Sequence, residues 1–416
     1  MNKFKSEFLN IMQERGFYNQ CTNEEGFDAY LYECETKGMP AVGYLGSDPT
    51  GDSLHVGHIV PLMMMRWFQK CGHKPITLVG GATARIGDPS GKDKLRPFLD
   101  ESTLQHNISG LKKSFMKFLQ FGDGPNDAIM VDNWDWFKDI NYLSFLRDIG
   151  TCYSVNRMLT MDSVKSRLER EQPMSFLEFN YMLLQGYDFC VLLQKYGCKA
   201  QIAGADQWGN IVSGTELGRR RYDTELFGFT SPILTDSSGK KMGKSEGNAV
   251  WINDDKLPAY DYYQYFRNIG DSEVGKCLRI FTDLPIDEIV RLEQLKDKEI
   301  NEAKKILALE ATKICRGEDE ALKAQQTAIN IFEQGLAGGE LPFISADLTS
   351  GISVLDAFLQ IGFVSSKGEA RRLIKQSGLK INDRVVVDEN YIITTDDLIE
   401  GSVKLSQGKK KIGLIK

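Results

Sequence analysis

The chain has 416 residues, 42% of them hydrophobic and 26% charged, which is typical of a globular protein with two or three domains. No run of 18 apolar residues exists and acidic residues interrupt the apolar pattern of the first 16, so we expect neither a membrane span nor a signal peptide. The eight cysteines form no CxxC pair, which argues against a zinc ribbon or a disulfide scaffold and favours a cytoplasmic protein.

The net charge of −6 is unevenly distributed. Residues 351–416 hold 11 Lys and Arg against 8 Asp and Glu, whereas the rest of the chain holds 40 against 49. A basic C-terminal module on an acidic body favours a polyanionic partner at that end, although a solvated basic surface has the same pattern.

The first half of the chain alternates short apolar strands with helical patterns. We predict strands at residues 39–45, 75–79, 128–131 and 199–203, each followed by a helix. Crossovers of this length give an α/β fold with a doubly wound parallel sheet of Rossmann type. Such sheets bind ligands at the carboxyl ends of their strands.

The second half changes in character. From about residue 256 to residue 335 the pattern is helical, with Ala303, Leu307 and Ala311 on one face. A Gly- and Ser-rich linker then precedes two short helices and a small β-unit. We therefore predict an α/β catalytic domain at 1–235, a loop at 236–250, a helical domain at 251–337, a linker at 338–350 and a small α+β domain at 351–416.

Two motifs indicate phosphate chemistry. His55 and His58 flank Gly57 in HVGH, and at the start of a helix this spacing puts both imidazoles on one face beside unpaired backbone N–H groups. Such a site binds anions. The lysines of KKMGKS (240–245) add charges suited to a polyphosphate. We expect the HVGH helix to begin near Ser53 as its N-cap, so that Pro61 kinks its interior.

Other interpretations of these motifs stay open. GKKMGKS (239–245) is one residue short of a P-loop and does not follow the first strand, which makes a P-loop phosphotransferase a poorer fit. A metal site would combine His55 and His58 with Cys71 and His73, but the spacing is not diagnostic and we predict no protein-bound metal. The lysine loop alone is also compatible with a solvated turn.

Together, HVGH and KMGKS resemble the HIGH and KMSKS signatures of class I aminoacyl-tRNA synthetases. Longer motifs resemble bacterial-type tyrosyl-tRNA synthetases in the same order: YLGSDPTGDSLHVGH (44–58), LVGGATARIGDPSGK (78–92), FNYMLLQGYDF (179–189) and AGADQWGN (203–210). SSKGEARRLIKQSGLKIND (365–383) is similar to a small RNA-binding module. The likeness covers essentially the whole chain, and it implies that the helical domain approaches the anticodon.

The resemblance implies a ligase that makes tyrosyl-adenylate from L-tyrosine and ATP, with Mg²⁺ accompanying the nucleotide, and then charges tRNA(Tyr). The residues to which it gives catalytic roles act on the phosphates and ribose of ATP: Thr50, His55, His58, Lys92, Arg96, Lys241 and Lys244. The further ATP-binding residues that it implies are Gly46, Asp48, Gly57, Gly204, Asp206 and, with Lys244, Ser245.

The same resemblance implies that Tyr44 and Asp188 select tyrosine by contacting its phenolic hydroxyl. Tyr181, Gln185 and Asp88 hold the α-ammonium, and Gln207 lies near the carboxylate. Tyr181, Gln185 and Asp188 fall at i, i+4 and i+7 on one helix face. A plain core helix has the same aromatic spacing, but a buried carboxylate without a partner is expensive, which favours a pocket.

The basic C-terminal module carries Arg371, Arg372 and Lys375 on one side of a short helix and a second cluster at 409–411, which suits contacts with RNA phosphates. The resemblance also implies a homodimer. The apolar stretch 134–149 offers a dimer surface, though a core helix explains it almost as well.

Two rival functions remain, a tryptophanyl-tRNA synthetase and an RNA-binding protein with a vestigial site. Tyr44 and Asp188 argue against the first, and intact His55, His58 and lysines argue against the second. The chain departs from the family at Leu45, where relatives often have Cys, and at Gly243 in KMGKS.

Overall fold

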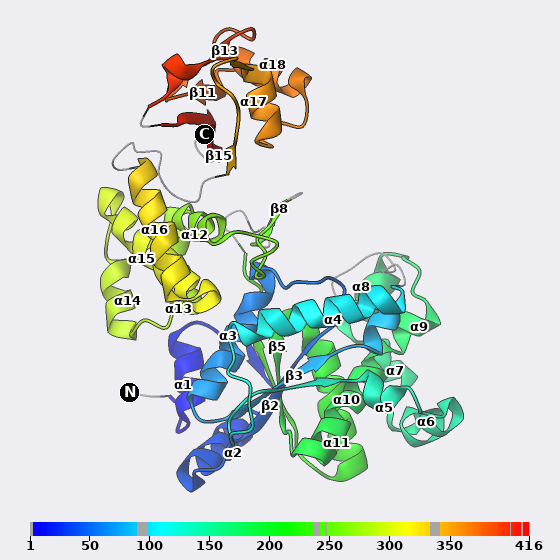
Figure 1. Cartoon of the computed structure of the whole chain (residues 1–416). Helices are drawn as coiled ribbons and strands as arrows, with labels where there is room; N and C mark the ends of the chain where they lie inside the picture. The colour runs from blue at the N-terminus through cyan, green and yellow to red at the C-terminus, as the bar shows by residue number, and fades with distance from the viewer. Residues whose placement is uncertain are drawn as a thin grey trace. The chain divides into compact units, whose positions relative to one another are not determined.

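The computed structural model describes residues 3–89, 99–235, 239, 242–245, 248–332, 342–399, 401–408 and 411–415. They form two compact units, Met1–Gly317 and Glu318–Lys416 (Figure 1). Among the helices of these ranges, none is long and apolar enough to cross a membrane.

A six-stranded sheet lies at the centre of the first unit, in the order β1-β6-β5-β2-β3-β4. All neighbours are parallel except β1, which is antiparallel to β6. The strands are β1 (Gln20–Cys21), β2 (Val42–Ser47), β3 (Lys74–Val79), β4 (Ile129–Asp132), β5 (Ala200–Gly204) and β6 (Phe227–Ser231). The predicted Rossmann-type class is confirmed, and the four predicted strands are the neighbours β5, β2, β3 and β4.

Helices cover both faces of this sheet (Figure 1). Tyr44 of β2 packs edge-on against Phe189, whereas its neighbour Gly43 lies against Phe68. Because successive strand residues point to opposite faces, the helices that carry Phe189 and Phe68, α10 and α3, cover opposite sides. The helices are α1 (Glu7–Glu14), α2 (Glu24–Lys37), α3 (Val56–Lys70), α4 (Glu101–Met116), α5 (Trp134–Phe137), α6 (Tyr142–Asp148), α7 (Val155–Met158), α8 (Asp162–Glu169), α9 (Phe176–Phe179), α10 (Tyr181–Tyr196) and α11 (Trp208–Tyr222).

The expectation that the HVGH helix begins near Ser53 is wrong. Helix α3 begins at Val56, and His55 is its N-cap. The residues before it are extended because the N–H of Ile252 donates to the carbonyl of Leu54 and His55 forms an antiparallel bridge with Trp251. Pro61 lies inside α3, as expected.

Four further helices complete the first unit: α12 (Ala259–Arg267), α13 (Val274–Phe281), α14 (Ile286–Glu293) and α15 (Ile300–Arg316). Charged side chains help connect these helices to the sheet domain. Arg66 and Lys70 near the end of α3 lie 2.6 and 2.8 Å from the carboxylate of Asp283, between α13 and α14. The buried guanidinium of Arg15 donates to the carbonyl of Thr282 at 2.9 Å. The C-terminal end of α3 is thereby tied to the helical part.

The second unit contains α16 (Glu318–Phe332) and, after it, two helices with small sheets, as predicted. Helices α17 (Val354–Gln360) and α18 (Lys367–Lys375) share a buried core with the strands, built around Phe358 and Leu405. A five-stranded sheet runs in the order β12-β11-β14-β15-β9, and β10 pairs with β13. The strands are β9 (Phe343–Ile344), β10 (Ile352–Ser353), β11 (Leu379–Ile381), β12 (Arg384–Val385), β13 (Ile392–Ile393), β14 (Val403–Gln407) and β15 (Lys411–Ile415).

Close packing of α4 on the loop before α3 depends on Gly110. A Cβ at this position would lie 1.9 Å from the carbonyl oxygen of Asp52, and backbone on both sides leaves little room to shift. We expect Gly110→Ala to lower the free energy of unfolding by about 1–3 kcal/mol, measured as a lower thermal midpoint. Gly150→Ala is the control, because its Cβ would meet nothing closer than 3.8 Å. Equal midpoints for Gly110→Ala and the parent chain would contradict this packing.

Candidate active site

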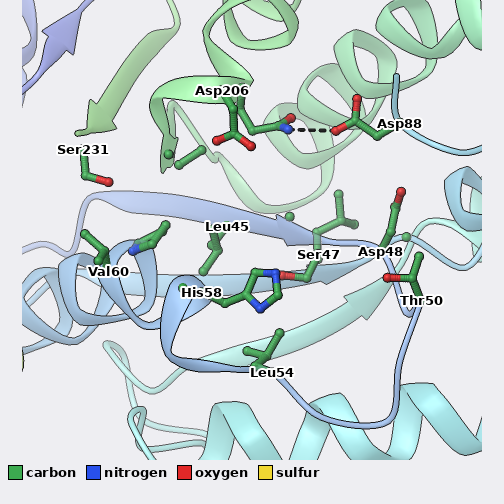
Figure 2. Close-up of a pocket in the computed structure, with 18 of the residues that line it drawn as sticks. Leu45, Ser47, Asp48, Thr50, Leu54, His58, Val60, Asp88, Asp206 and Ser231 are labelled. Atoms are coloured by element: carbon green, nitrogen blue, oxygen red, sulfur yellow. Dashed lines mark hydrogen bonds between the residues drawn. The ribbon is translucent and has the colours of Figure 1, made fainter. Parts of the chain in front are cut away.

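A cavity of about 310 Å³ opens at the carboxyl ends of the parallel strands, between the N-terminal end of α3 and helix α10 (Figure 2). This volume is at the lower end of the range for small-molecule sites. The predicted residues that line it are Tyr44, Gly46, Asp48, Thr50, His55, Gly57, His58, Asp88, Tyr181, Gln185, Asp188, Gly204, Asp206 and Gln207. Residues as far apart in the sequence as Tyr44 and Gln207 therefore share one cavity.

Some predicted residues cannot be placed against this cavity. Lys92, Arg96 and Lys241 lie outside the described residues. Lys244 and Ser245 form the short strand β7 (Lys244–Ser245), paired with β8 (Asn248–Ala249), and the description covers only their backbone. Met242, from the same motif, lines the cavity.

Asp188 and Tyr44 form a buried polar pair at the cavity wall. Asp188 is 1% exposed, and burial raises its pKa to about 8, against two hydrogen bonds that lower it. The side chain of Tyr44 is fully buried, and its hydroxyl has no hydrogen-bond partner among the described residues. Burial and the nearby carboxylate of Asp188 raise the pKa of Tyr44 well above its usual value, so the hydroxyl keeps its proton. A buried hydroxyl of this kind is a site for a ligand with a matching polar atom.

Sequence reasoning missed the two residues that hold Asp188. The indole N–H of Trp136 donates to one carboxylate oxygen at 2.8 Å, and the amide of Asn133 donates to the other at 3.1 Å. Both residues follow the carboxyl end of β4, one of the four predicted strands. A polar residue directly after that strand was the available signal, but the stretch from 134 was interpreted as core or dimer surface.

Two further polar pairs organise the cavity. Asp48 accepts hydrogen bonds from the hydroxyl of Tyr181 at 3.0 Å and from Thr83 at 2.7 Å. Across the cavity, the amide of Gln207 donates to Asp88 at 2.8 Å, the dashed line in Figure 2. Carboxylates, hydroxyls and an amide from four separate segments thus converge where a ligand with charged groups would lie.

His55 and His58 are paired at the start of α3, and their ring centroids are 4.0 Å apart. The Nδ1 of His55 accepts from the N–H of Gly57 at 3.0 Å, and the Nδ1 of His58 accepts from the N–H of His55 at 3.3 Å. Each ring therefore uses Nδ1 as an acceptor, and the neutral tautomer carries its proton on Nε2. Both imidazoles can donate to an anion from Nε2 without losing their capping role.

The metal site that would combine His55 and His58 with Cys71 and His73 is not assembled in the structure. Within the described ranges, no group of three or more His, Cys, Asp or Glu is arranged to hold a metal ion. Cys71 is the C-cap of α3 and lies at the opposite end of that helix from His55 and His58. The buried His73 accepts from the N–H of Ala41 instead.

The predicted RNA-binding residues are in the second unit. Arg371, Arg372 and Lys375 are exposed on α18, on the side opposite the buried Ile374. Arg371 lies 3.6 Å from Glu389, a loose surface ion pair. Of the second basic cluster, residues 409 and 410 lie outside the described residues, and Lys411 donates to the carbonyl of Phe363.

Comparisons with known proteins agree with this geometry. A family model described as tRNA synthetases class I (W and Y) matches residues 36–333, and an S4 domain model matches residues 355–399. The tyrosine–tRNA ligase of Nitrobacter winogradskyi is 51% identical over 420 residues, covering all of both chains. The chain belongs to the tyrosine–tRNA ligase family of class I tRNA synthetases.

Solved structures support the same assignment. A C-terminally truncated mitochondrial tyrosyl-tRNA synthetase from Aspergillus nidulans has a TM-score of 0.69 and 30% identity, covering 78% of this chain and 94% of that one. A tryptophanyl-tRNA synthetase from Encephalitozoon cuniculi bound to tryptophan has a TM-score of 0.53 at 12% identity, covering 79% and 91%. The latter likeness extends to the fold alone.

The burial of Asp188 predicts a pH dependence of stability. Its pKa of about 8 lies above that of an exposed aspartate, near 4, so the folded state keeps a proton that the unfolded chain releases. The folded state therefore loses stability from this group as the pH rises between these values. Because Asn does not titrate, the thermal midpoint of Asp188→Asn minus that of the parent should be larger at about pH 8.5 than at about pH 5. A difference that stays constant or shrinks with pH would contradict the buried protonation.

Proposed function

We propose that the chain attaches L-tyrosine to tRNA(Tyr) in two steps, forming tyrosyl-adenylate and pyrophosphate from ATP and then transferring the tyrosyl group to the 3′-terminal adenosine. The observation that carries this proposal is the buried pair of Tyr44, whose hydroxyl lacks a partner among the described residues, and Asp188, held by Asn133 and Trp136. A phenolic hydroxyl accepts from Tyr44 and donates to Asp188 at once.

Other aromatic amino acids do not satisfy both groups. Phenylalanine has no polar atom to offer, so binding it would leave Tyr44 and Asp188 buried and unpaired. An indole N–H donates but does not accept, so tryptophan leaves the hydroxyl proton of Tyr44 without an acceptor. The pair therefore favours tyrosine over both, and this distinguishes the chain from a tryptophanyl enzyme.

The remaining polar groups suit the ends of the amino acid and the nucleotide. Asp88, Tyr181 and Gln185 would hold the α-ammonium, and Gln207, which donates to Asp88, would lie near the carboxylate. The residues assigned to the ribose and nucleotide are Gly46, Asp48, Gly57, Gly204, Asp206 and Ser245. The lining of the cavity by most of these residues supports a single site for both substrates.

Adenylate formation needs no covalent enzyme intermediate, so its catalysis consists of positioning and charge stabilisation. Thr50 and His55 would bind the γ-phosphate and His58 the ribose side, each imidazole donating from Nε2. Lys92, Arg96, Lys241 and Lys244 would neutralise the departing pyrophosphate. Mg²⁺ would arrive with ATP, since magnesium is usually bound by substrate phosphates with few protein ligands.

tRNA binding would involve the second unit and the helical part of the first. The S4 domain model matches the segment that carries Arg371, Arg372 and Lys375, whose exposed charges suit phosphate contacts. We place the protein in the cytoplasm, since all eight cysteines are free thiols.

We further propose a homodimer, built on helices α6, α7 and α9, which lie on one side of the first unit in Figure 1. Leu143 of α6 is 74% exposed and Phe176 of α9 is 68% exposed, and Tyr142 of α6 and Val155 of α7 are exposed as well. Apolar surface gathered in this way marks protein interfaces. The exposure favours the dimer interpretation of 134–149 over a core helix.

A charge within this surface should dissociate the dimer. We expect Leu143→Asp to shift the sedimentation-equilibrium mass from that of two chains toward that of one. Val290→Asp, on exposed α14, is the control and should sediment like the parent. A monomeric parent chain would contradict the dimer, and a dimeric Leu143→Asp variant would contradict its location.

The function itself is tested by pyrophosphate–ATP exchange with tyrosine, phenylalanine, tryptophan or no amino acid. Exchange with tyrosine alone, followed by transfer of labelled tyrosine to tRNA, is the expected result. Exchange with tryptophan would reassign the specificity, and no exchange from protein that still binds tRNA would mean a vestigial site.

Tyr44→Phe tests the recognition of the phenol. Losing one hydrogen bond should lower kcat/KM for tyrosine by about 3- to 10-fold, with that for phenylalanine unchanged. Tyr18→Phe, which removes a hydroxyl bonded to Glu24 far from the cavity, should leave both values unchanged. Equal losses for tyrosine and phenylalanine in Tyr44→Phe would show that Tyr44 does not read the hydroxyl.

A further inference from the structure

Residues 250–257 have no role in the proposed function, yet they run along the start of α3. We call them the bracket segment. The N–H of Val56 donates to the carbonyl of Val250, and the N–H of Ile252 donates to the carbonyl of Leu54, both at 2.9 Å. Between these bonds, Trp251 pairs with His55 as an antiparallel bridge. The backbone that presents His55 is therefore half of a short two-stranded pairing with the bracket segment.

The buried side chain of Asn253 stabilises this pairing through hydrogen bonds. It is 3% exposed, and its side-chain amide donates to the carbonyls of Asp52 and Gly110, both at 3.0 Å. Its side-chain oxygen accepts from Ser114 of α4 at 2.8 Å, and its own N–H donates to Ser53 at 3.1 Å. One side chain thus joins the bracket segment, the loop before His55 and helix α4.

Ion pairs reinforce the same arrangement at the surface. Lys256 lies 2.6 Å from Asp52, in the loop before His55, and holds the pKa of that carboxyl below its usual value. Lys117, the C-cap of α4, lies 2.8 Å from Asp254. Both pairs connect the bracket segment to the elements that Asn253 joins.

Arg316, at the end of α15, holds the other side of the bracket segment. Its side chain is 1% exposed, and its guanidinium donates to the carbonyls of Ile252, Trp251 and Leu257. It also lies 3.0 Å from the carboxylate of Asp254 and stacks over the ring of Tyr262. Carbonyls that accept no bond within a regular element are thereby satisfied by one buried cation from the helical part.

The KMGKS motif meets α3 at the same place. Gly243 has a φ of +81°, and a Cβ there would lie 3.0 Å from the backbone nitrogen of Gly57. The backbones of the two signatures are therefore in contact, and the chain from Gly243 leads through β7 and β8 directly into the bracket segment. Residues 250–253 are therefore bonded to the segment that carries His55 and follow the KMGKS motif closely in the chain.

We propose that Asn253 and Arg316 are positioning residues for adenylate formation, which act through the bracket segment to fix the start of α3 and its imidazoles against the nucleotide. This rests on the proposed function. The role is confined to the nucleotide side, because neither residue nor the bracket segment is among those that hold Tyr44 or Asp188. Substitutions of Asn253 or Arg316 should therefore impair the reaction with ATP while leaving the affinity for tyrosine unchanged.

The test compares Asn253→Ala with Asn10→Ala in the full chain. Asn10 is a matched control, since its buried amide also makes three side-chain hydrogen bonds, to Phe4 and Ser6, in the N-terminal segment. Rates of pyrophosphate exchange are divided by the sites counted in an adenylate burst, which removes any loss of folded protein. Equilibrium dialysis with labelled tyrosine gives its Kd separately.

We expect Asn253→Ala to lower kcat/KM for ATP by about 10- to 100-fold, the loss that a small misplacement of reacting groups produces, with the Kd for tyrosine within about 2-fold of the parent. Arg316→Ala should behave likewise, and Arg316→Lys should recover part of the loss, because an ammonium replaces some but not all of the carbonyl contacts. Asn10→Ala should match the parent per active site.

Equal kinetics for Asn253→Ala and Asn10→Ala would overturn the positioning role while leaving the function intact. A parallel loss of tyrosine affinity would also overturn it, since it would indicate general damage to the site. A parent chain without tyrosine-dependent exchange would overturn the proposed function and this role with it.

Discussion

Burying a carboxylate is costly unless its surroundings compensate, and Asp188 is almost fully removed from water. The strand order brings two donors to it: β4, on the edge of the sheet, ends beside α10, so that Asn133 and Trp136 reach both oxygens. Even so, burial dominates and raises the pKa of Asp188 to about 8. A substrate hydroxyl would give Asp188 and the neighbouring buried hydroxyl of Tyr44 a further hydrogen-bond partner.

The opposite side of the cavity depends on a different constraint, the unpaired N–H groups at the start of α3. His55 and His58 satisfy two of them with Nδ1, which leaves Nε2 as the donor on each ring. The position of these rings is set by backbone pairing with residues 250–252, far along the chain. The capping bonds and the strand pairing therefore act on the start of α3, and the buried guanidinium of Arg316 holds the segment paired with it. The C-terminal end of α3 is held separately, by Asp283.

Much of the fold could be predicted from the sequence, because β2 to β5 are apolar runs separated by helical patterns of ordinary length. Strand β6, with its buried Phe227 and Phe229, was missed, and so was the two-residue β1, which is too short to leave a pattern. The start of α3 was placed near Ser53 because serine is a common N-cap. Tertiary pairing with Trp251 overrode that preference, and no local signal reveals such a pairing.

The sequence motifs predicted many of the residues that line the cavity, but not the residues that hold them in place. Family motifs led to Tyr44, Asp188 and the histidines, which do line one cavity. The residues that hold them lie outside those motifs: Asn133, Trp136, Asn253 and Arg316. Their roles follow from contacts between segments that are distant in the sequence. Such long-range hydrogen bonds depend on topology, which periodicity and composition do not specify.

The central claim is that the buried hydroxyl of Tyr44 and the buried carboxyl group of Asp188 recognise the phenol of tyrosine. Isothermal titration of the unmodified chain with L-tyrosine and with L-phenylalanine, without ATP, tests it most directly. The account predicts a saturable heat for tyrosine and none for phenylalanine at the same concentrations. Similar affinities for the two amino acids would contradict it, since the buried pair would then contribute nothing to selection.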